Sequence, residues 1–497
     1  MTNLSGATRI KAATSGQSEA VATPLEKLRE FLETHGMKGK TGPRAFAEFE
    51  AELHARMMEA ERDVIAAEMA KLDVEADAIE IAGKVHRRVL RQSQTYMTSA
   101  GEVVVERTLY KDRTEDEGRC VSPMELALGI VGDFWTPRAA QQALWVATQM
   151  TPKKSAELFG RMGNMAPSKS SIDRLPKVLS ERWEGNREHF ERALREGFDI
   201  PDGAVSITVS LDGVLAPIDG GNSPTQVRAN AVVEGRTSKG PAGYREASCA
   251  TIAFCDEMGD LLGAIRIARA PEPRKATLKK MLAAEVMAVL AAKPELKLVK
   301  IADGATDNWE FLSSAALPKG DEAIDFFHAA EHLHAAIAAA YGDGTHETRY
   351  RYETLRDTLR DDDKGADKVI RALKHLAAKH PLKKSIVVEL AYFRKNRRRM
   401  NYAGLRARKL MIGSGIVEAA CKTLVTQRLK QSGMRWSAAG AQAILTARGW
   451  DQSERFDQAW ALIAGTFEVD VTVLANVIAL RPNPASRASK RIRAASR

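Results

Sequence analysis

The sequence is poor in cysteine and contains no long apolar run. Its 497 residues include four cysteines, which are scattered and form no C-x-x-C pair. This usage indicates a reducing compartment and argues against a zinc module. No run approaches the roughly 18 apolar residues of a membrane helix, and the first twenty residues lack the apolar segment of a secretory signal. We therefore expect a cytoplasmic protein with no membrane partner.

Acidic residues are absent from two basic stretches, although the whole chain is only mildly basic. The net charge is +10, whereas residues 391–410 hold eight cations and residues 481–497 hold six. Such density suits neutralisation of phosphates, and Tyr392, Phe393 and Tyr402 add rings that could stack on bases. A solvated helix face would produce the same pattern, and a basic tail alone says little. We predict a polyanion partner, contacted by these cations of the internal stretch: Arg394, Lys395, Arg397, Arg398, Arg399, Arg406 and Arg408.

Hydropathy spacing divides the chain into seven segments. Helical spacing begins at Pro24, and strand-forming residues around Gly101 predict a β-hairpin at 94–111. The predicted segments are a disordered tail (1–23), an N-terminal helical region with the hairpin (24–120), a helix-turn-helix-like DNA-binding region (121–195), the first part of an α/β core (196–342), a basic helical insertion (343–410), the second part of the core (411–450), and C-terminal helices with a basic tail (451–497).

The helix-turn-helix-like region rests on two short helices joined by a turn that contains glycine and proline. Ser168 is placed to open the second helix, which carries Lys169 and Arg174 as candidate DNA contacts. Helical hairpins are common and mostly structural, so both interpretations stay open here.

The core is predicted from a change of period to two residues after about residue 203. Alternating residues from Val205 to Leu211, followed by strand-like runs at 225–236 and 245–257, predict an antiparallel meander of three strands. A helix, a strand ending at Asp303, and a further helix–strand–helix run follow. This order is that of the RNase H-like fold. The predicted class is therefore α+β and multidomain, with an RNase H-like α/β core interrupted by a helical insertion and preceded by a mostly helical DNA-binding region.

Three acids stand out by their placement in this order. Asp212 ends the polar face of the first strand, and Asp303 ends a strand that lies beside it and parallel to it. Glu418 lies in the first turns of a helix that follows a Gly-Ser-Gly sequence. Each acid alone is most simply a turn or cap residue. Together they are the hard oxygen ligands that two Mg²⁺ ions require, and such a pair of ions promotes in-line displacement at phosphorus.

With these residues in place, the sequence resembles the DDE transposases of bacterial insertion sequences, specifically the ISKra type, which is related to the Mutator-like group. The similarity lies in LDGVLAPI around Asp212, IADGATDNW around Asp303, DFFHAAEHL at 325–333, and the long stretch GSGIVEAACKTLVTQRLKQSGMRWSAAGAQAILTAR at 413–448. It covers roughly residues 95–450. It implies catalytic, metal-binding roles for Asp212, Asp303 and Glu418, two Mg²⁺ ions with Mn²⁺ as a substitute, cleavage at transposon ends, and transfer of the 3′-OH into target DNA.

The resemblance also implies auxiliary residues and further DNA contacts. Asp325 and His328 are similar to the C/D-x-x-H element of Mutator-like transposases, although His328 could equally cap the next helix. The Glu-x6-Lys signature of another transposase group would require a cation at position 425, where this chain has Val425. Either Lys422, one turn after Glu418, or Arg428 and Lys430, two to three turns on, could take the phosphate-contacting role, and both alternatives stay open. Arg435 is a further candidate DNA contact. Trp436 is expected to pack in the core rather than stack on a base.

The sequence therefore predicts a transposase that acts on double-stranded DNA, both transposon ends and target, as a homodimer or larger homo-oligomer at the bacterial nucleoid. Two alternatives remain. One is a DNA-binding regulator without catalysis, and the other is an RNase H-like nuclease that cleaves without strand transfer.

Overall fold

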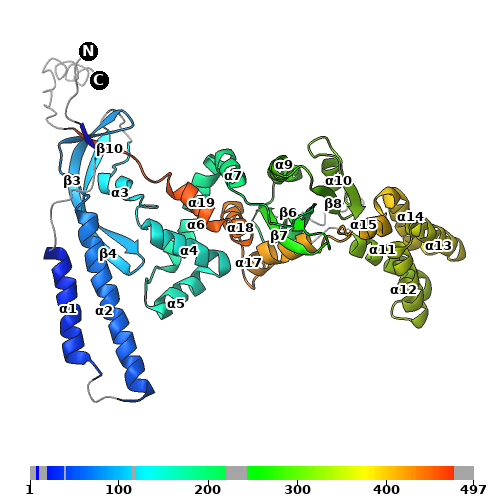
Figure 1. Cartoon of the computed structure of the whole chain (residues 1–497), viewed down its shortest axis with the longest axis horizontal. Helices are drawn as coiled ribbons and strands as arrows, with labels where there is room; N and C mark the ends of the chain where they lie inside the picture. The colour runs from blue at the N-terminus through cyan, green and yellow to red at the C-terminus, as the bar shows by residue number, and fades with distance from the viewer. Residues whose placement is uncertain are drawn as a thin grey trace, which may run out of the picture. The chain divides into compact units, whose positions relative to one another are not determined.

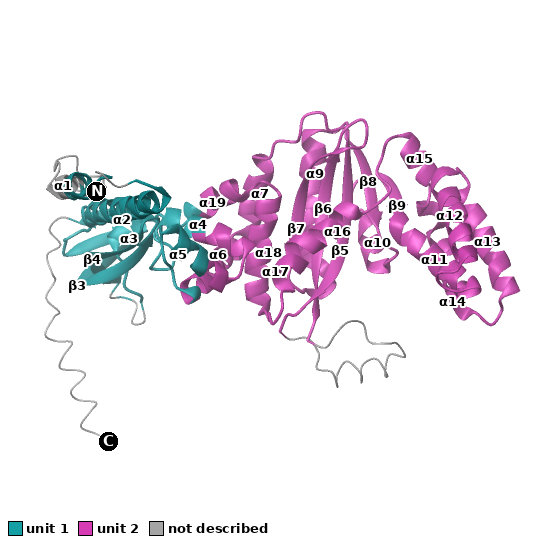
Figure 2. Ribbon diagram, turned by 90° about the horizontal axis from the view of Figure 1, so that it is seen from below, with its two compact units in different colours: residues 1–142, 156–169, 464–497 teal, residues 143–155, 170–463 magenta. Residues whose placement is uncertain are grey.

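The structure, a computed structural model, describes residues 7–9, 19–37, 41–112, 114, 118–219 and 243–474. It is α+β, with two five-stranded sheets, and the chain folds into two compact units (Figure 2). Unit 1 comprises residues 1–142, 156–169 and 464–497, and unit 2 comprises residues 143–155 and 170–463. None of the helices in the described part of the chain is long and apolar enough to cross a membrane.

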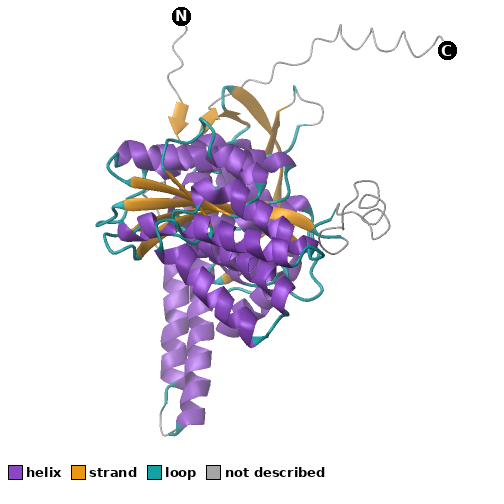
Figure 3. Cartoon of the chain, turned by 90° about the vertical axis from the view of Figure 1, so that its right-hand side faces the viewer, coloured by secondary structure: helices purple, strands orange, loops and turns teal. Residues whose placement is uncertain are grey.

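Unit 1 is built on an antiparallel sheet and a pair of long helices that lie side by side in both Figure 1 and Figure 3. The helices are joined by the ion pair of Lys27 with Asp63 at 3.1 Å. In the order of the sheet the strands are β1 (Ala7–Arg9), β10 (Val471–Leu474), β2 (Ala78–Ile81), β3 (Lys84–Thr98) and β4 (Gly101–Asp112); the helices are α1 (Glu19–His35), α2 (Pro43–Ala70) and α3 (Pro123–Leu128).

The hairpin predicted at 94–111 is confirmed as β3 and β4, which pair from Thr98 with Gly101 outward. Gly101 has a φ of 118°, a conformation open to glycine and strained for other residues. Two terminal segments differ from expectation. The predicted tail at 1–23 contains β1 and the start of α1, and the predicted C-terminal helices are followed by β10, which pairs with β1 and β2. Strands of three or four residues are too short to produce a recognisable alternation.

Two further helices, α4 (Pro137–Gln149) and α5 (Pro152–Met162), each contain a position in the sequence at which the chain changes from one unit to the other. Most of α5 belongs to unit 1, whereas α6 (Lys169–Gly185) belongs to unit 2 from its second residue onward. Both helices predicted for the helix-turn-helix-like region are therefore present. Their role in DNA binding stays a prediction.

Unit 2 is built on a mixed sheet. Its strands run in the order β7 (Leu261–Arg269), β6 (Arg245–Cys255), β5 (Ser206–Ala216), β8 (Lys297–Ala302) and β9 (Asp321–Ile324). Neighbouring strands among β7, β6 and β5 are antiparallel, and β5, β8 and β9 are parallel to one another.

A meander of three antiparallel strands is present, but its membership differs from the prediction. The third strand is β7, which the sequence analysis missed because Gly263 and Arg266 interrupt its apolar pattern. The strand predicted at 225–236 lies outside the described residues.

Helices cover both faces of this sheet because its strands alternate apolar residues between the faces. Ile207, Val209 and Leu211 of β5 share one core cluster with α9, whereas Ala216 of the same strand and Cys249 of β6 share another with α16 and α18. The covering elements of unit 2 are α7 (Arg187–Glu196), η1 (Pro273–Lys275), α9 (Ala276–Ala292), α10 (Thr306–Leu312), α16 (Gly415–Ala420), the π-helix η3 (Cys421–Thr426), α17 (Gln427–Leu429), α18 (Ala438–Gln452) and α19 (Phe456–Ala464).

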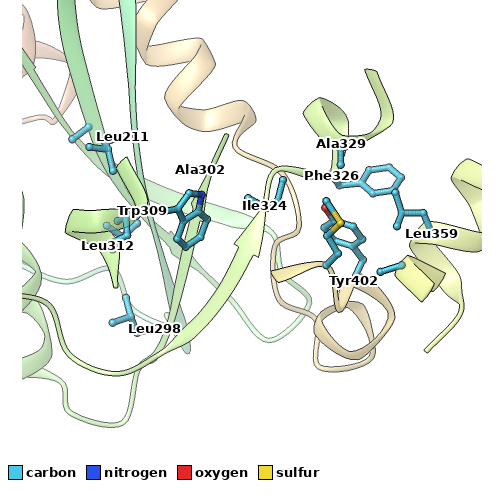
Figure 4. Close-up of a cluster of buried hydrophobic side chains, with 14 of the residues drawn as sticks. Leu211, Leu298, Ala302, Trp309, Leu312, Ile324, Phe326, Ala329, Leu359 and Tyr402 are labelled. Carbon is cyan, nitrogen blue, oxygen red and sulfur yellow. The ribbon is translucent and has the colours of Figure 1, made fainter. Parts of the chain in front are cut away.

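Residues 343–410 are helical, as predicted, and lie with α11 beyond the β9 edge of the sheet (Figure 2). One apolar cluster runs without a break from Leu298 and Trp309 beside the sheet to Phe326 and Tyr402 among these helices (Figure 4). The helices therefore share the core of unit 2. They are α11 (Phe326–Tyr341), α12 (His346–Asp361), α13 (Gly365–Lys379), α14 (Lys384–Asn396), the 3₁₀ turn η2 (Arg397–Arg399) and α15 (Tyr402–Ala407).

Candidate active site

An aspartate follows the same register position on each of the three parallel strands. Ser210 of β5 pairs with Ile301 of β8, so Asp212 and Asp303, each two residues further on, fall at matching positions. Ala302 of β8 pairs with Ile324 of β9, and the next residues are Asp303 and Asp325. The carboxyl ends of parallel strands meet at one edge of a sheet. Asp303 and Asp325 directly follow the carboxyl ends of β8 and β9. Asp212 is level with them in register, but it lies inside β5, which runs on to Ala216, rather than at the end of the strand as predicted.

Asp303 is held in place by the turn that follows β8. Its Oδ1 accepts hydrogen bonds from Asn308 Nδ2 at 3.0 Å and from the Ala305 N–H at 3.2 Å. Its carbonyl oxygen accepts one from Trp309 Nε1 at 2.6 Å. Asn308 and Trp309 are buried in the first turns of α10. These contacts fix the carboxylate through groups with little freedom to move.

Asp212 lies on the face of β5 that α16 covers. Burial raises the pKa of its carboxyl group above the ordinary value, and the negative charge of Asp303 raises it further. A hydrogen bond from the Gly213 N–H to Oδ1, at 2.7 Å, acts in the opposite direction. Cys421 of η3 places its Sγ 3.9 Å from Oδ2. A buried carboxylate beside a second negative charge is a site that favours a cation.

Glu418 reaches the same edge from α16. Partial burial of its carboxyl group raises its pKa, and the charges of Asp325 and Asp212 contribute in the same direction. Ser414 Oγ lies 3.5 Å from Oε1, and the Ser414 carbonyl accepts the Glu418 N–H at 3.2 Å. Glu418 therefore shares the electrostatic environment of the aspartates, although it lies more than two hundred residues from Asp212 in the sequence.

Asp325 links the sheet edge to the segment before α16. It is 1% exposed and caps α11 by accepting the N–H groups of Phe327 at 2.6 Å and His328 at 3.1 Å. Its Oδ2 accepts the Ser414 N–H at 2.7 Å and the Ser414 hydroxyl. The cap of α11 is thus Asp325 rather than His328, which lies in the first turn. Asp325 is a positioning residue for Ser414 and, through it, for Glu418.

Helix α14 contributes Tyr392 to this site, a role that the sequence analysis did not assign. Burial raises the pKa of its hydroxyl group, as do the charges of Asp303, Asp325 and Glu389. The hydroxyl has no hydrogen-bond partner within the described part of the chain. A Cβ on Gly304 would lie 2.5 Å from Tyr392 Cε2, so this glycine allows the ring to approach the loop after β8.

The other two rings of the basic stretch do not fit the predicted role in base stacking. Phe393 and Tyr402 are fully buried in the core of unit 2. Tyr392 is half-buried and stacks on His332, with ring centroids 3.8 Å apart. The rings alternate with cations because α14 and α15 each present one face to the core and one to solvent.

Half of the cations in the basic stretch have acidic partners. Arg397 donates to Asp367 at 2.7 Å and Arg399 to Glu322 at 2.7 Å, and the remaining pairs are Arg406 with Asp361 and Arg408 with Asp321. Lys395 donates to the Thr306 hydroxyl at 2.9 Å. Arg394 and Arg398 are exposed, and neither forms an ion pair with a described residue. The stretch therefore offers less free charge than the sequence suggests.

The remaining candidate DNA contacts divide by exposure. Arg428 is buried, donates to the Ala147 carbonyl from both Nε and Nη2, and lies over the Trp436 ring, so its predicted contact with DNA is wrong. Trp436 packs against the α16–α18 core cluster as expected. The other predicted contacts are exposed, on α6 and after Glu418: Lys169, Arg174, Lys422, Lys430 and Arg435.

The oxygen atoms of Asp212 and Asp303 suit a Mg²⁺ ion that is bound by two carboxylates and not fully surrounded by protein ligands. Among the described residues, no three histidine, cysteine or acidic side chains are arranged to hold one metal ion. Asp303 nevertheless lies close enough to Asp212 for its charge to raise the pKa of the Asp212 carboxyl group. Mg²⁺ is commonly bound by one or two carboxylates, with water and substrate phosphates completing its shell. The pair fits that pattern.

No protein-family model matches the sequence, and no curated protein matches it. The solved structures that resemble it include the Drosophila P element transposase strand transfer complex, which is 9% identical over 73% of this chain and 87% of that chain, with a TM-score of 0.25. A similarity of this size supports no conclusion about fold or function.

Proposed function

We propose that the chain is a DDE transposase with an RNase H-like core, of the insertion-sequence type that its motifs resemble. It binds transposon-end DNA, cleaves it at the element ends and transfers the freed 3′-OH into target DNA. The observation that carries the proposal is the alignment of Asp212, Asp303 and Asp325 at matching register positions of the parallel strands, with Glu418 in the same electrostatic environment.

The residues divide into three roles. Asp212 and Asp303 would hold Mg²⁺ with Glu418 beside them, and Mn²⁺ would substitute. Bound there, the metal would neutralise charge on the scissile phosphate and lower the pKa of a water or hydroxyl nucleophile. Asp325 keeps the Ser414 segment, and with it Glu418, against the strand ends. Tyr392 places a buried hydroxyl next to Asp303 that has no hydrogen-bond partner among the described residues and could donate a hydrogen bond to a phosphate oxygen.

DNA would approach this edge over an exposed cationic surface. Arg394 and Arg398 are exposed on α14 and η2, the segment that also carries Tyr392, and Lys422 lies one turn after Glu418. Their charges neutralise phosphates without reading sequence. End recognition is assigned to residues 121–195, and a homo-oligomer would bring two ends together.

The test uses the full chain and a duplex that carries a candidate element end. Mg²⁺-dependent nicking at the end, followed by joining of a pre-cleaved 3′-OH end to a second duplex, is the expected result. A band shift with no nicking would instead indicate a DNA-binding regulator. Nicking without joined product would indicate a nuclease without strand transfer. Either outcome would contradict the proposal.

A further inference from the structure

Two histidines on successive turns of α11 point their Nε2 atoms at each other. His328 and His332 are four residues apart, so they lie on one face of the helix. The two Nε2 atoms are 3.3 Å apart. The side chains are 40% and 29% exposed, so a small ion has access to the space between them from solvent.

The opposite nitrogen of each ring faces a carboxylate. His332 Nδ1 lies 2.6 Å from Glu389 Oε2 of α14, and His328 Nδ1 lies 3.5 Å from Glu331 Oε2. A carboxylate accepts but cannot donate when ionised, so the neutral His332 ring carries its proton on Nδ1 and a lone pair on Nε2. The longer contact of His328 Nδ1 with Glu331 favours the same tautomer of His328. Two lone pairs that face each other at this distance repel unless a cation lies between them.

The separation of the nitrogens matches one coordination geometry. Zn²⁺ binds histidine nitrogen at about 2.0–2.1 Å in tetrahedral sites, and an angle of about 109° between two such bonds places the nitrogens about 3.3–3.4 Å apart. An octahedral angle of about 90° would bring them to about 2.9 Å at the same bond length. The observed 3.3 Å corresponds to the tetrahedral arrangement.

We propose that His328 and His332 form a binding site for a transition-metal ion of the Zn²⁺ class, with Glu389 orienting His332. Hydrogen bonding of a ligating histidine through its second nitrogen to a carboxylate is the usual support of such sites, and Tyr392 stacks on the His332 ring and restricts its rotation. The two remaining positions of the ion stay open to water or to an anionic oxygen.

This site differs in ligand chemistry from the carboxylate edge, which is the group formed by Asp212, Asp303 and Glu418. Imidazole nitrogens select Zn²⁺, Ni²⁺ and Cu²⁺, whereas Mg²⁺ prefers oxygen. It also joins two parts of unit 2, because its ligands lie on α11 and its supporting carboxylate lies on α14 of the insertion. Metal binding by this histidine pair does not depend on the proposed DNA cleavage.

The experiment is a titration of the full, chelator-stripped protein with Zn²⁺ and with Co²⁺. Calorimetry should detect a Zn²⁺ ion that is lost in His328→Ala and in His332→Ala, and Co²⁺ should give the absorption of a tetrahedral complex that both variants lose. Glu389→Gln should weaken binding about 10–100-fold without abolishing it. Millimolar Mg²⁺ should not compete.

The matched control is His334→Ala on the same helix. This side chain is 43% exposed, and its Nε2 lies 3.8 Å from Asp343, away from the pair. It should bind metal as wild type does. If wild type and both alanine variants take up the same amount of Zn²⁺, or if wild type takes up none, the nitrogens share a proton and the proposal is wrong. Thermal melts of the metal-free variants, expected near wild type, separate a missing ligand from a disrupted fold.

Discussion

Replacement of Asp325 by alanine should destabilise unit 2 far more than the loss of an ordinary helix cap. The carboxylate is buried and accepts hydrogen bonds from two N–H groups of α11 and from the N–H and hydroxyl of Ser414. Loss of the cap costs about 1 kcal/mol. The buried Ser414 N–H then lacks an acceptor, which costs about 1–3 kcal/mol more. We expect a total loss of about 2–4 kcal/mol in the free energy of unfolding.

The assay is urea denaturation followed by tryptophan fluorescence. Ser437→Ala is the matched control. Ser437 caps α18 in the same unit but lies at the surface, and its hydroxyl oxygen accepts a single hydrogen bond, from the Gly440 N–H at 3.1 Å. It should cost only about 1 kcal/mol. Asp325→Asn should fall between the two, since an amide keeps the cap but turns a donor toward Ser414 or its neighbours. If Asp325→Ala costs no more than Ser437→Ala, the link from the strand end to α16 does not contribute to stability as argued.

Two further predictions concern charge. The first is a salt titration, in which the logarithm of the DNA-binding constant is plotted against the logarithm of the salt concentration. Alanine at Arg394 and Arg398 should lower the slope of this plot by about 0.9 for each phosphate that is no longer neutralised. Alanine at Arg397 and Arg399 should lower it less, because their charges are already paired, and equal changes would contradict this difference. Burial raises the pKa of Glu191 to about 7. Its contribution to stability is therefore present below the ordinary pKa near 4.5 and is lost as the pH rises through 7. Urea melts at pH 4 and pH 8 should show the free energy of unfolding of Glu191→Gln rising by up to about 3 kcal/mol relative to that of wild type between the two pH values.

The carboxylate edge was accessible from the sequence because it depends on local patterns. The alternation around Asp212 and the apolar strand before Asp303 locate both acids on neighbouring strands, and the order of strands and helices makes those strands parallel. The sequence did not show that β5 continues past Asp212 to Ala216. The Gly-Ser-Gly sequence before Glu418 likewise marks a helix start. Such features follow from the backbone period alone.

Long-range contacts were not accessible in the same way. Nothing near Tyr392 in the sequence indicates that its ring lies against Gly304, almost ninety residues earlier. The basic stretch shows its charges, but the acids that neutralise them lie elsewhere, as Glu322 does for Arg399. Burial of Arg428 depends on a carbonyl of α4. A single sequence shows the charge of a side chain but not its distant partners.

The most direct test of the central claim compares amide variants of the edge carboxylates in the Mg²⁺-dependent nicking assay. Asp212→Asn, Asp303→Asn and Glu418→Gln should each abolish nicking while binding of end DNA stays near wild type or improves slightly, because an amide keeps the shape and loses the charge that holds the metal. Asp307→Asn is the control, because Asp307 lies on α10 and forms an ion pair with Lys279 at 2.9 Å. This variant should keep its nicking activity. If all three amide variants still nick DNA, the carboxylate edge is not the catalytic site.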